Sequence, residues 1–171
     1  ELGLFFTPMI FINGVELKWW SIPSRLAPAV NRVADALAAG SIEAQVRPPL
    51  VGLERYIDDW RGNQIVQVPA RSLDLVRQSQ DTSVPNVTVF ADFTSPGTAE
   101  VLGGIRDWEK KHGPVTLDLR MYPFNRNCNP SLPAKITNRP GACLGARAYF
   151  AAGLVGGPEG ASKMADWIFD Q

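Results

Sequence analysis

The sequence predicts an α/β protein, and three features carry that prediction. A strand, a helix and a second strand follow one another within Val87–Tyr122, which is the pattern of a β-α-β unit with a parallel strand pair. The apolar stretch Thr7–Ile12 is closed by Asn13-Gly14, a dipeptide typical of β-hairpin turns because both residues tolerate positive φ. An apolar content of 45% is that of an ordinary globular core.

Composition excludes several classes of protein. The 171 residues include 17 basic and 17 acidic ones, so the formal net charge is zero and nothing favours nucleic acid or an anionic membrane surface. The apolar runs are too short to cross a bilayer. With one histidine and two cysteines, we expect no metal site and no cofactor. Because there is neither an initiator methionine nor a signal peptide, we expect a fragment of a longer protein.

Residues 1–40 form the first expected unit. Val15–Trp20 is predicted to be the returning strand of the hairpin. A helix is predicted over Arg25–Ala39, because apolar residues recur there at helical spacing and Gly40 supplies a stop. The Thr7-Pro8 bond at the head of the first strand is a candidate cis peptide.

Residues 41–84 are interpreted as a connector. Val51–Trp60 has the spacing of a short amphipathic helix, Ile65–Val68 alternates like an edge strand, and Ala70–Arg77 is predicted to be another short helix. A connector of this length is unusual inside a compact domain, which favours an interdomain linker that packs on its neighbours.

Residues 85–171 form the second unit, in which a strand, a helix and a strand are followed by a long loop and two helices. In chain order, the expected elements are the strand Val87–Phe93, a helix from about Ala99 to Lys111, the strand Val115–Tyr122, the loop Pro123–Pro140, and the helices Ala142–Leu154 and Ala161–Phe169. The glycines of Gly156–Gly160 are expected to separate the last two helices.

The turn Ser95-Pro96-Gly97-Thr98 joins the first strand of the second unit to its helix. A helix N-terminus offers unpaired backbone N–H groups and the positive end of the helix dipole, so such a turn is a common place for chemistry. We expect Ser95 or Thr98 simply to cap the helix. A serine hydrolase would need a base beside Ser95. The one histidine, His112, lies at the far end of the same helix, where it is expected to interact with the last carbonyls.

Two segments resemble the thioredoxin superfamily, specifically its DsbA-like branch as found in fusions to vitamin K epoxide reductase-like membrane proteins. Val89–Thr98 resembles the strand that ends in a Cys-x-x-Cys motif at a helix N-terminus, with Ser-Pro-Gly-Thr in its place. Thr7–Gly14 resembles the cis-proline strand and its hairpin, with Pro8 as the cis-proline. The chain from Tyr122 to Asp170 is similar to the helical insert of these domains. The resemblance implies a thioredoxin-like fold with a helical insert.

The order of the two signatures differs from that of the family, in which the Cys-x-x-Cys strand comes first. Here Pro8 precedes Ser95. Residues 1–40, with the hairpin and a C-terminal helix, are therefore either the end of one thioredoxin-like domain in a tandem or one half of a circularly permuted domain. Residues 85–171, with the β-α-β unit and the helical insert, would begin the next domain or supply the other half. A domain-swapped dimer would also join the two parts.

The missing cysteines remove the family's redox chemistry from this turn. Thiol–disulfide exchange needs a thiolate, and the hydroxyls of Ser95 and Thr98 neither form a disulfide nor ionise near neutral pH. We therefore expect a redox-inactive module, rather than an enzyme, that binds or positions a polypeptide or a neighbouring domain. In active relatives the backbone beside the cis-proline holds the substrate peptide, and Phe5, Phe6 and Pro8 are expected to shape that surface.

Two other functions stay open: a purely structural interdomain piece, and a thiol-disulfide oxidoreductase fragment. The oxidoreductase would act through cysteines outside this chain or through Cys128 and Cys143. These two are expected to form a structural disulfide that closes the proline-rich loop, with reduced buried thiols and a redox pair as alternatives. A disulfide implies an oxidising compartment. We therefore expect a bacterial, extracytoplasmic or periplasmic location, with tethering through a membrane domain of the parent protein.

Overall fold

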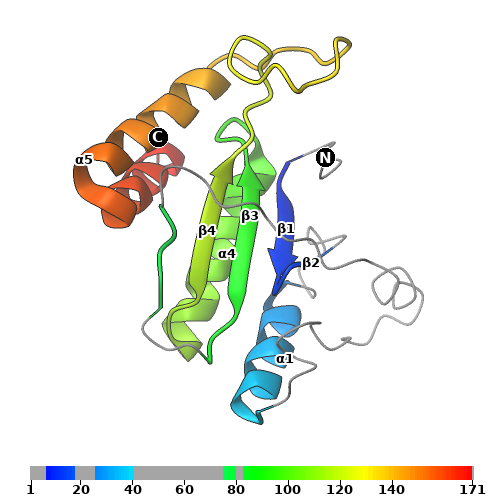
Figure 1. The fold of residues 1–171 in the computed structure, drawn as a ribbon, viewed down its shortest axis with the longest axis vertical. Coiled ribbons are helices and arrows are strands. Elements are labelled where there is room, and N and C mark those ends of the chain that lie inside the picture. The colour runs from blue at the N-terminus through cyan, green and yellow to red at the C-terminus, as the bar shows by residue number, and fades with distance from the viewer. Residues whose placement is uncertain (1–6, 18–25, 41–74, 80–82, 171) are drawn as a thin grey trace.

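The computed structural model describes residues 7–17, 26–40, 75–79 and 83–170 of the chain (Figure 1). In chain order, the elements of this part are β1 (Met9–Ile12), β2 (Val15–Glu16), α1 (Leu26–Ala38), β3 (Asn86–Ala91), α4 (Pro96–His112), β4 (Thr116–Met121) and α5 (Ala142–Phe169). The chain is mixed α/β, which confirms the predicted class. Within the described residues, no helix combines the length and the apolar character that crossing a bilayer requires.

The strands form one sheet in the order β2-β1-β3-β4 (Figure 1). β1 is antiparallel to both β2 and β3, whereas β3 and β4 are parallel, with α4 as the connection between them. The hairpin of residues 1–40 and the β-α-β unit of residues 85–171 therefore share a single sheet. In its register, Met9 lies opposite Phe90, so the start of β1 meets the end of β3.

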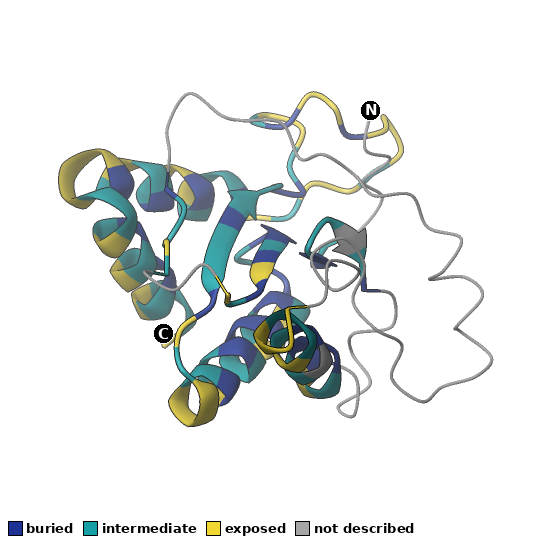
Figure 2. Cartoon of the chain, turned by 60° about the horizontal axis from the view of Figure 1, so that its bottom comes forward, coloured by how far each residue is buried: buried dark blue, intermediate teal, exposed yellow. Residues whose placement is uncertain are grey.

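The two faces of the sheet carry different cores, because side chains alternate along each strand. Ile10 and Ile12 of β1 and Val87 and Val89 of β3 belong to the main core. Helices α1 and α4 lie together on one side of the sheet and pack into this core (Figure 2). Tyr149, Ala161 and Ala165 of α5 also belong to it. Helices α1 and α4 also contact each other, since the indole N–H of Trp108 donates to Asn31 Oδ1.

A second, smaller cluster occupies the opposite face of the sheet. Met9, Phe11 and Phe90 are buried there, with Tyr122 packed against them. The rings of Phe11 and Phe90 meet edge to face with their centroids 5.8 Å apart, a geometry that aromatic quadrupoles favour. In the described part of the chain, no helix lies over this face (Figure 1).

The boundaries around the turn differ slightly from the predicted ones. β3 ends at Ala91 rather than Phe93, because Asp92 already begins the turn: its carbonyl accepts the Ser95 N–H at 2.9 Å. α4 begins at Pro96, about three residues earlier than predicted. Proline suits the first helical position because its φ is already helical and its missing N–H has no partner to lose.

The prediction of a helix over Ala70–Arg77 is wrong at its C-terminal end, because Leu75–Arg77 is not helical. Arg77 exchanges backbone hydrogen bonds of 2.9 and 3.0 Å with Leu117 of β4. The outer edge of β4 thus satisfies backbone groups that a helical turn would otherwise have to pair. Outside the described residues lie the other elements predicted for the connector, Val51–Trp60 and Ile65–Val68.

Helix α5 contains the predicted break. Gly157 has φ 61° and ψ −156°, and Pro158 follows it. That backbone region is essentially restricted to glycine. The two halves approach closely across the kink: a Cβ added to Gly160 would lie 2.6 Å from the carbonyl oxygen of Ala152. The break confirms that two helices, rather than one straight helix, occupy this part of the chain.

We expect Gly157→Ala to lower the free energy of unfolding by roughly 1–3 kcal/mol, because alanine is forced into a glycine-only conformation. Gly103→Ala in α4 is the matched control, since nothing lies within 4 Å of its added Cβ and the backbone is helical. It should raise stability by up to about 1 kcal/mol. Denaturant unfolding of both variants measures the difference, and equal effects would contradict the assigned kink.

Candidate functional site

The sheet brings the two predicted halves of the site together. The Thr7–Pro8 peptide bond is cis and directly precedes β1. Because β1 is antiparallel to β3, this bond arrives at the edge of the sheet where β3 ends and α4 begins. The Ser95 hydroxyl donates to the Thr7 carbonyl oxygen at 3.2 Å. Residues 88 positions apart in sequence are thus in direct contact. Phe5 and Phe6, the other residues predicted for this surface, lie outside the described residues.

The prediction that Ser95 or Thr98 caps the helix through its side chain is wrong. Ser95 occupies the N-cap position with extended backbone angles, but its side chain makes no capping hydrogen bond. Its hydroxyl is instead committed to the carbonyl of Thr7, which β1 delivers from the other side of the turn. The Ser95 carbonyl accepts the Thr98 N–H at 2.9 Å, so the first turn of α4 is closed by backbone alone.

Thr98 faces the interior. Its side chain is fully buried, and its hydroxyl finds no hydrogen-bond partner among the residues that the structure describes. A buried hydroxyl without a partner costs free energy because water once satisfied it. The second hydroxyl of the turn is therefore packed away from solvent, whereas Pro96 is exposed.

Neither hydroxyl is set up as a nucleophile. Ser95 is 6% exposed and donates to a backbone carbonyl rather than to a base. His112 ends α4 at its opposite end, where its ring stacks on Trp108 with the two ring centroids 4.8 Å apart. Among the described residues, no group of three or more His, Cys, Asp or Glu side chains is placed to hold a metal ion.

The carboxylate of Asp92 organises the turn. It is 1% exposed. Its Oδ1 accepts from the backbone N–H and the hydroxyl of Thr94 at 2.8 and 2.7 Å, and its Oδ2 accepts from the Phe124 N–H at 2.9 Å. The guanidinium of Arg139 lies 3.9 Å from Oδ2 and 5.0 Å from the centre of the Phe124 ring. One side chain thus joins the loop after β3 to the loop after β4.

Sequence reasoning missed Asp92, although a signal was present. An acidic residue placed directly after the buried strand Val87–Ala91 cannot easily reach water. Such a group is retained only where hydrogen bonds or a cation compensate its desolvation. Its position at the end of a buried strand, next to a polar turn, therefore indicated a buried carboxylate that needs hydrogen-bond partners.

Cys128 and Cys143 form a disulfide, the state that the sequence favoured. It closes a loop of 15 residues, which contributes about 3 kcal/mol on the loop-entropy model. The loop lies against the turn: a Cβ added to Gly141 would be 3.7 Å from Thr94 Cγ2. Within the loop, the Arg139 N–H donates to the Phe124 carbonyl at 2.7 Å. Both cysteines are partly exposed.

The shifted pKa values belong to exposed ion pairs on helix surfaces. A hydrogen bond from Lys110 lowers the pKa of Asp107. A hydrogen bond from Lys163 lowers the pKa of Glu159, and the same contact raises the pKa of Lys163. All of these groups are solvated, so the shifts describe surface pairing rather than chemistry.

Comparison with known proteins adds no relative. No protein-family model matches the chain, and no match was found among curated proteins or solved structures. What the chain does must therefore be inferred from the order of its sheet and from the contacts of the turn.

We expect Asp92→Asn to lower the free energy of unfolding by roughly 1.5–3 kcal/mol. The amide replaces one acceptor by a donor, which then faces the N–H of Phe124 or the donors of Thr94. Asp107→Asn, at an exposed ion pair with Lys110, is the control and should change stability by less than about 0.5 kcal/mol. Equal losses in the two variants, measured by denaturant unfolding, would show that Asp92 has no special role.

A pair of threonine variants tests the two hydroxyl environments. Thr98→Val removes an unpaired buried hydroxyl at almost constant volume and should raise the free energy of unfolding by about 1 kcal/mol. Thr94→Val removes the hydrogen bond to Asp92 and should lower it by about 1–2 kcal/mol. We expect the two substitutions to change the free energy of unfolding in opposite directions in the same denaturation experiment. A clear loss of stability in Thr98→Val would mean that its hydroxyl is paired.

Proposed function

We propose that the chain is a redox-inactive, thioredoxin-like module of the DsbA type that binds a polypeptide or a neighbouring domain beside the Ser95 turn. The observation that carries this proposal is the hydrogen bond of 3.2 Å from the Ser95 hydroxyl to Thr7, directly before the cis bond to Pro8. In the family that the sequence resembles, the first cysteine of the redox motif stands at the position of Ser95. Here a hydroxyl occupies that position.

The order of the sheet supports the proposal. The two segments that carry the resemblance form the neighbouring strands β1 and β3, although 70 or more residues separate them. Helix α1 of residues 1–40 and helix α4 of residues 85–171 pack on the same face of this sheet (Figure 2). Each segment thus supplies what the other lacks, as the halves of a circularly permuted domain would.

The proposed activity is binding because the reactive atoms of the turn are gone. A serine or threonine hydroxyl cannot carry a disulfide, and the positive end of a helix does not bring its pKa near neutrality. Of the four turn residues, Pro96 is exposed and Gly97 is partly exposed, whereas Ser95 and Thr98 are buried. An extended polypeptide can lie there without being chemically altered.

Thiol–disulfide exchange at Cys128 and Cys143 is the second candidate. Cys143 is the second residue of α5, and a helix N-terminus favours a thiolate. Both cysteines are partly exposed, so a partner's thiol can approach them. A disulfide is compatible with an oxidising compartment, and we accordingly infer an extracytoplasmic location for either function.

Restoring the two cysteines tests the proposed site. The double variant Ser95→Cys and Thr98→Cys, made together with Cys128→Ser and Cys143→Ser, should catalyse the reduction of insulin by dithiothreitol. The parent that carries only the two serine replacements should be inactive. The physical reason is that thiols at the start of α4 would gain the thiolate character that hydroxyls lack. A folded double variant without activity would count against a thioredoxin-like site.

The unmodified chain separates the two candidates in the same assay. No activity is expected if the disulfide is structural. Activity that disappears in Cys128→Ser/Cys143→Ser would establish exchange at that pair and contradict the redox-inactive proposal.

Binding is measured by fluorescence anisotropy with a labelled, unfolded and carboxymethylated polypeptide. We expect saturable binding that Pro96→Glu weakens about tenfold, because a charge is placed on the exposed part of the turn. Lys110→Glu changes a solvated side chain near the other end of α4 and should leave binding unchanged. Equal weakening by both variants would place any binding elsewhere.

A further inference from the structure

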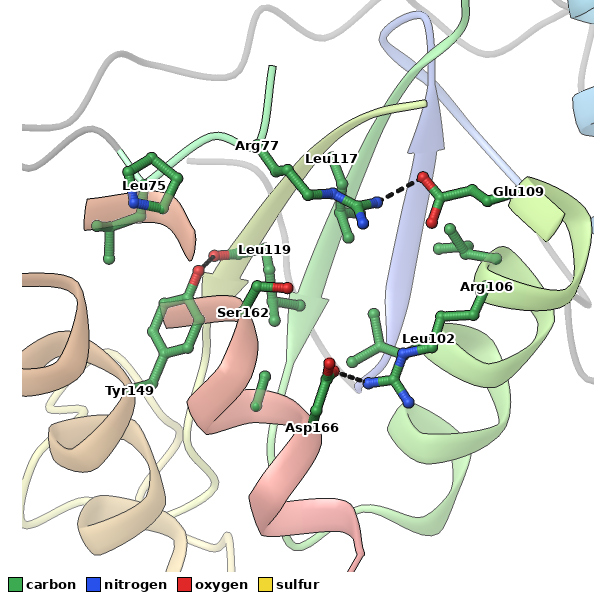
Figure 3. A pocket seen from close by; sticks show the side chains of 13 residues that line it. Leu75, Arg77, Leu102, Arg106, Glu109, Leu117, Leu119, Tyr149, Ser162 and Asp166 are labelled. Atoms are coloured by element: carbon green, nitrogen blue, oxygen red, sulfur yellow. Dashed lines mark hydrogen bonds and ion pairs between the residues drawn. The ribbon is translucent and has the colours of Figure 1, made fainter. Parts of the chain in front are cut away.

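A pocket lies beside the middle of α4, from Leu102 to Glu109, and none of the Ser95 turn lines it. It is lined by residues of α4, β4, both halves of α5 and the segment around Arg77, and it is open on one side (Figure 3). Its volume is about 130 Å³. That is similar to the apolar cavities of ~150 Å³ that hold one benzene molecule. The pocket is thus large enough for a ring or a branched chain of about six heavy atoms.

The walls of the pocket are largely apolar. Leu102 and Ile105 come from α4, Leu119 from β4, and Tyr149 and Ala165 from α5. The Tyr149 hydroxyl donates to the Leu119 carbonyl at 3.2 Å, so the phenol presents its ring, and its polar end is already satisfied. Burial of an apolar group against these walls is favourable in proportion to the area removed from water.

Two ion pairs border the pocket. Arg77 Nη2 lies 2.6 Å from Glu109 Oε1, and Arg106 Nη2 pairs with Asp166 Oδ1 (Figure 3). Glu109 Oε1 also accepts the Val115 N–H at 2.9 Å. The carboxylates are therefore engaged, and the two pairs together carry no net charge.

Arg77 and Arg106 each have N–H donors that their ion pair does not use. A guanidinium has five N–H donors, yet in the described structure each of these two uses one terminal nitrogen for its carboxylate. Their side chains are 35% and 37% exposed. Ser162 adds a hydroxyl at the same pocket. A pocket with apolar walls and unused donors at its border suits a ligand that brings acceptors.

We propose that this pocket binds a small organic acid whose apolar body is about the size of a benzene ring. Its carboxylate would accept from Arg106, with Arg77 and Ser162 as further donors, while its body fills the space between Leu102 and Leu119. Arginine suits this role because its planar fork matches the two oxygens of a carboxylate. The site is independent of the function proposed for the Ser95 turn.

Benzoate is the probe, titrated into the full chain and followed by calorimetry and by shifts of amide resonances. We expect saturable binding of one molecule. Benzyl alcohol, which has the same ring without the charge, should bind at least about tenfold more weakly. Arg106→Gln should weaken benzoate about tenfold, and Ser162→Leu should abolish binding by filling the pocket. Arg147→Gln, at an exposed position of α5 outside the pocket, is the control.

Thermal unfolding and circular dichroism establish that each variant is folded before its binding is compared. The proposal is overturned if benzoate shows no saturable binding, if folded Ser162→Leu binds as the unmodified chain does, or if Arg147→Gln weakens binding as much as Arg106→Gln. Equal affinities for benzoate and benzyl alcohol would also overturn it, because the carboxylate would then have no partner.

Discussion

The buried carboxylate of Asp92 holds together the end of the sheet where the candidate site lies. It accepts two hydrogen bonds from Thr94 and one from Phe124, so it fixes the loop after β3 and the loop after β4 at one point. Arg139 lies near the carboxylate and over the Phe124 ring. A carboxylate so far from water is tolerated only because its oxygens have these partners. The hydrogen bonds of Asp92 also place the start of α4, since the helix begins at Pro96, two residues after Thr94.

The same part of the molecule leaves neither hydroxyl of the turn set up as a nucleophile. The Ser95 hydroxyl connects α4 to β1 through Thr7, and Thr98 is packed into the core. The Ser95 side chain therefore joins two chain segments, and the Thr98 side chain is part of the packed interior. The nearby loop is held by a disulfide and by hydrogen bonds around Phe124. A turn held at several points loses little conformational entropy on binding, which favours the polypeptide-binding role proposed for it.

Helix α4 contributes to both of the ligand sites proposed for this molecule. Its N-terminus meets the cis peptide bond, and its C-terminal half supplies Arg106 and Glu109 to the pocket. The two differ in chemistry, since the first presents the exposed Pro96, whereas the second has apolar walls and guanidinium donors. Because no residue of the Ser95 turn lines the pocket, variants at one can be studied with the other intact.

Local sequence determined much of this structure. Asn13-Gly14 makes the hairpin turn because both residues take positive φ, at 48° and 81°. Apolar periodicity placed α1, β3, α4 and β4 to within a few residues, and the glycines at 156–160 located the kink of α5. Ser95 and Thr98 already exclude redox chemistry at the turn, because that depends only on which atoms are present.

Only the tertiary structure decided which groups meet. Ser95 pairs with Thr7 rather than capping its own helix, because β1 brings a carbonyl from 88 residues away. The Asp92 carboxylate accepts from the Phe124 N–H, 32 residues away in the sequence. Arg77 is extended because its backbone pairs with Leu117 at the edge of β4. Periodicity and propensity act over a few residues, so they specify elements but not the partners of a side chain at an element's end. Those partners are fixed when the strands align in register, which is a property of the whole sheet.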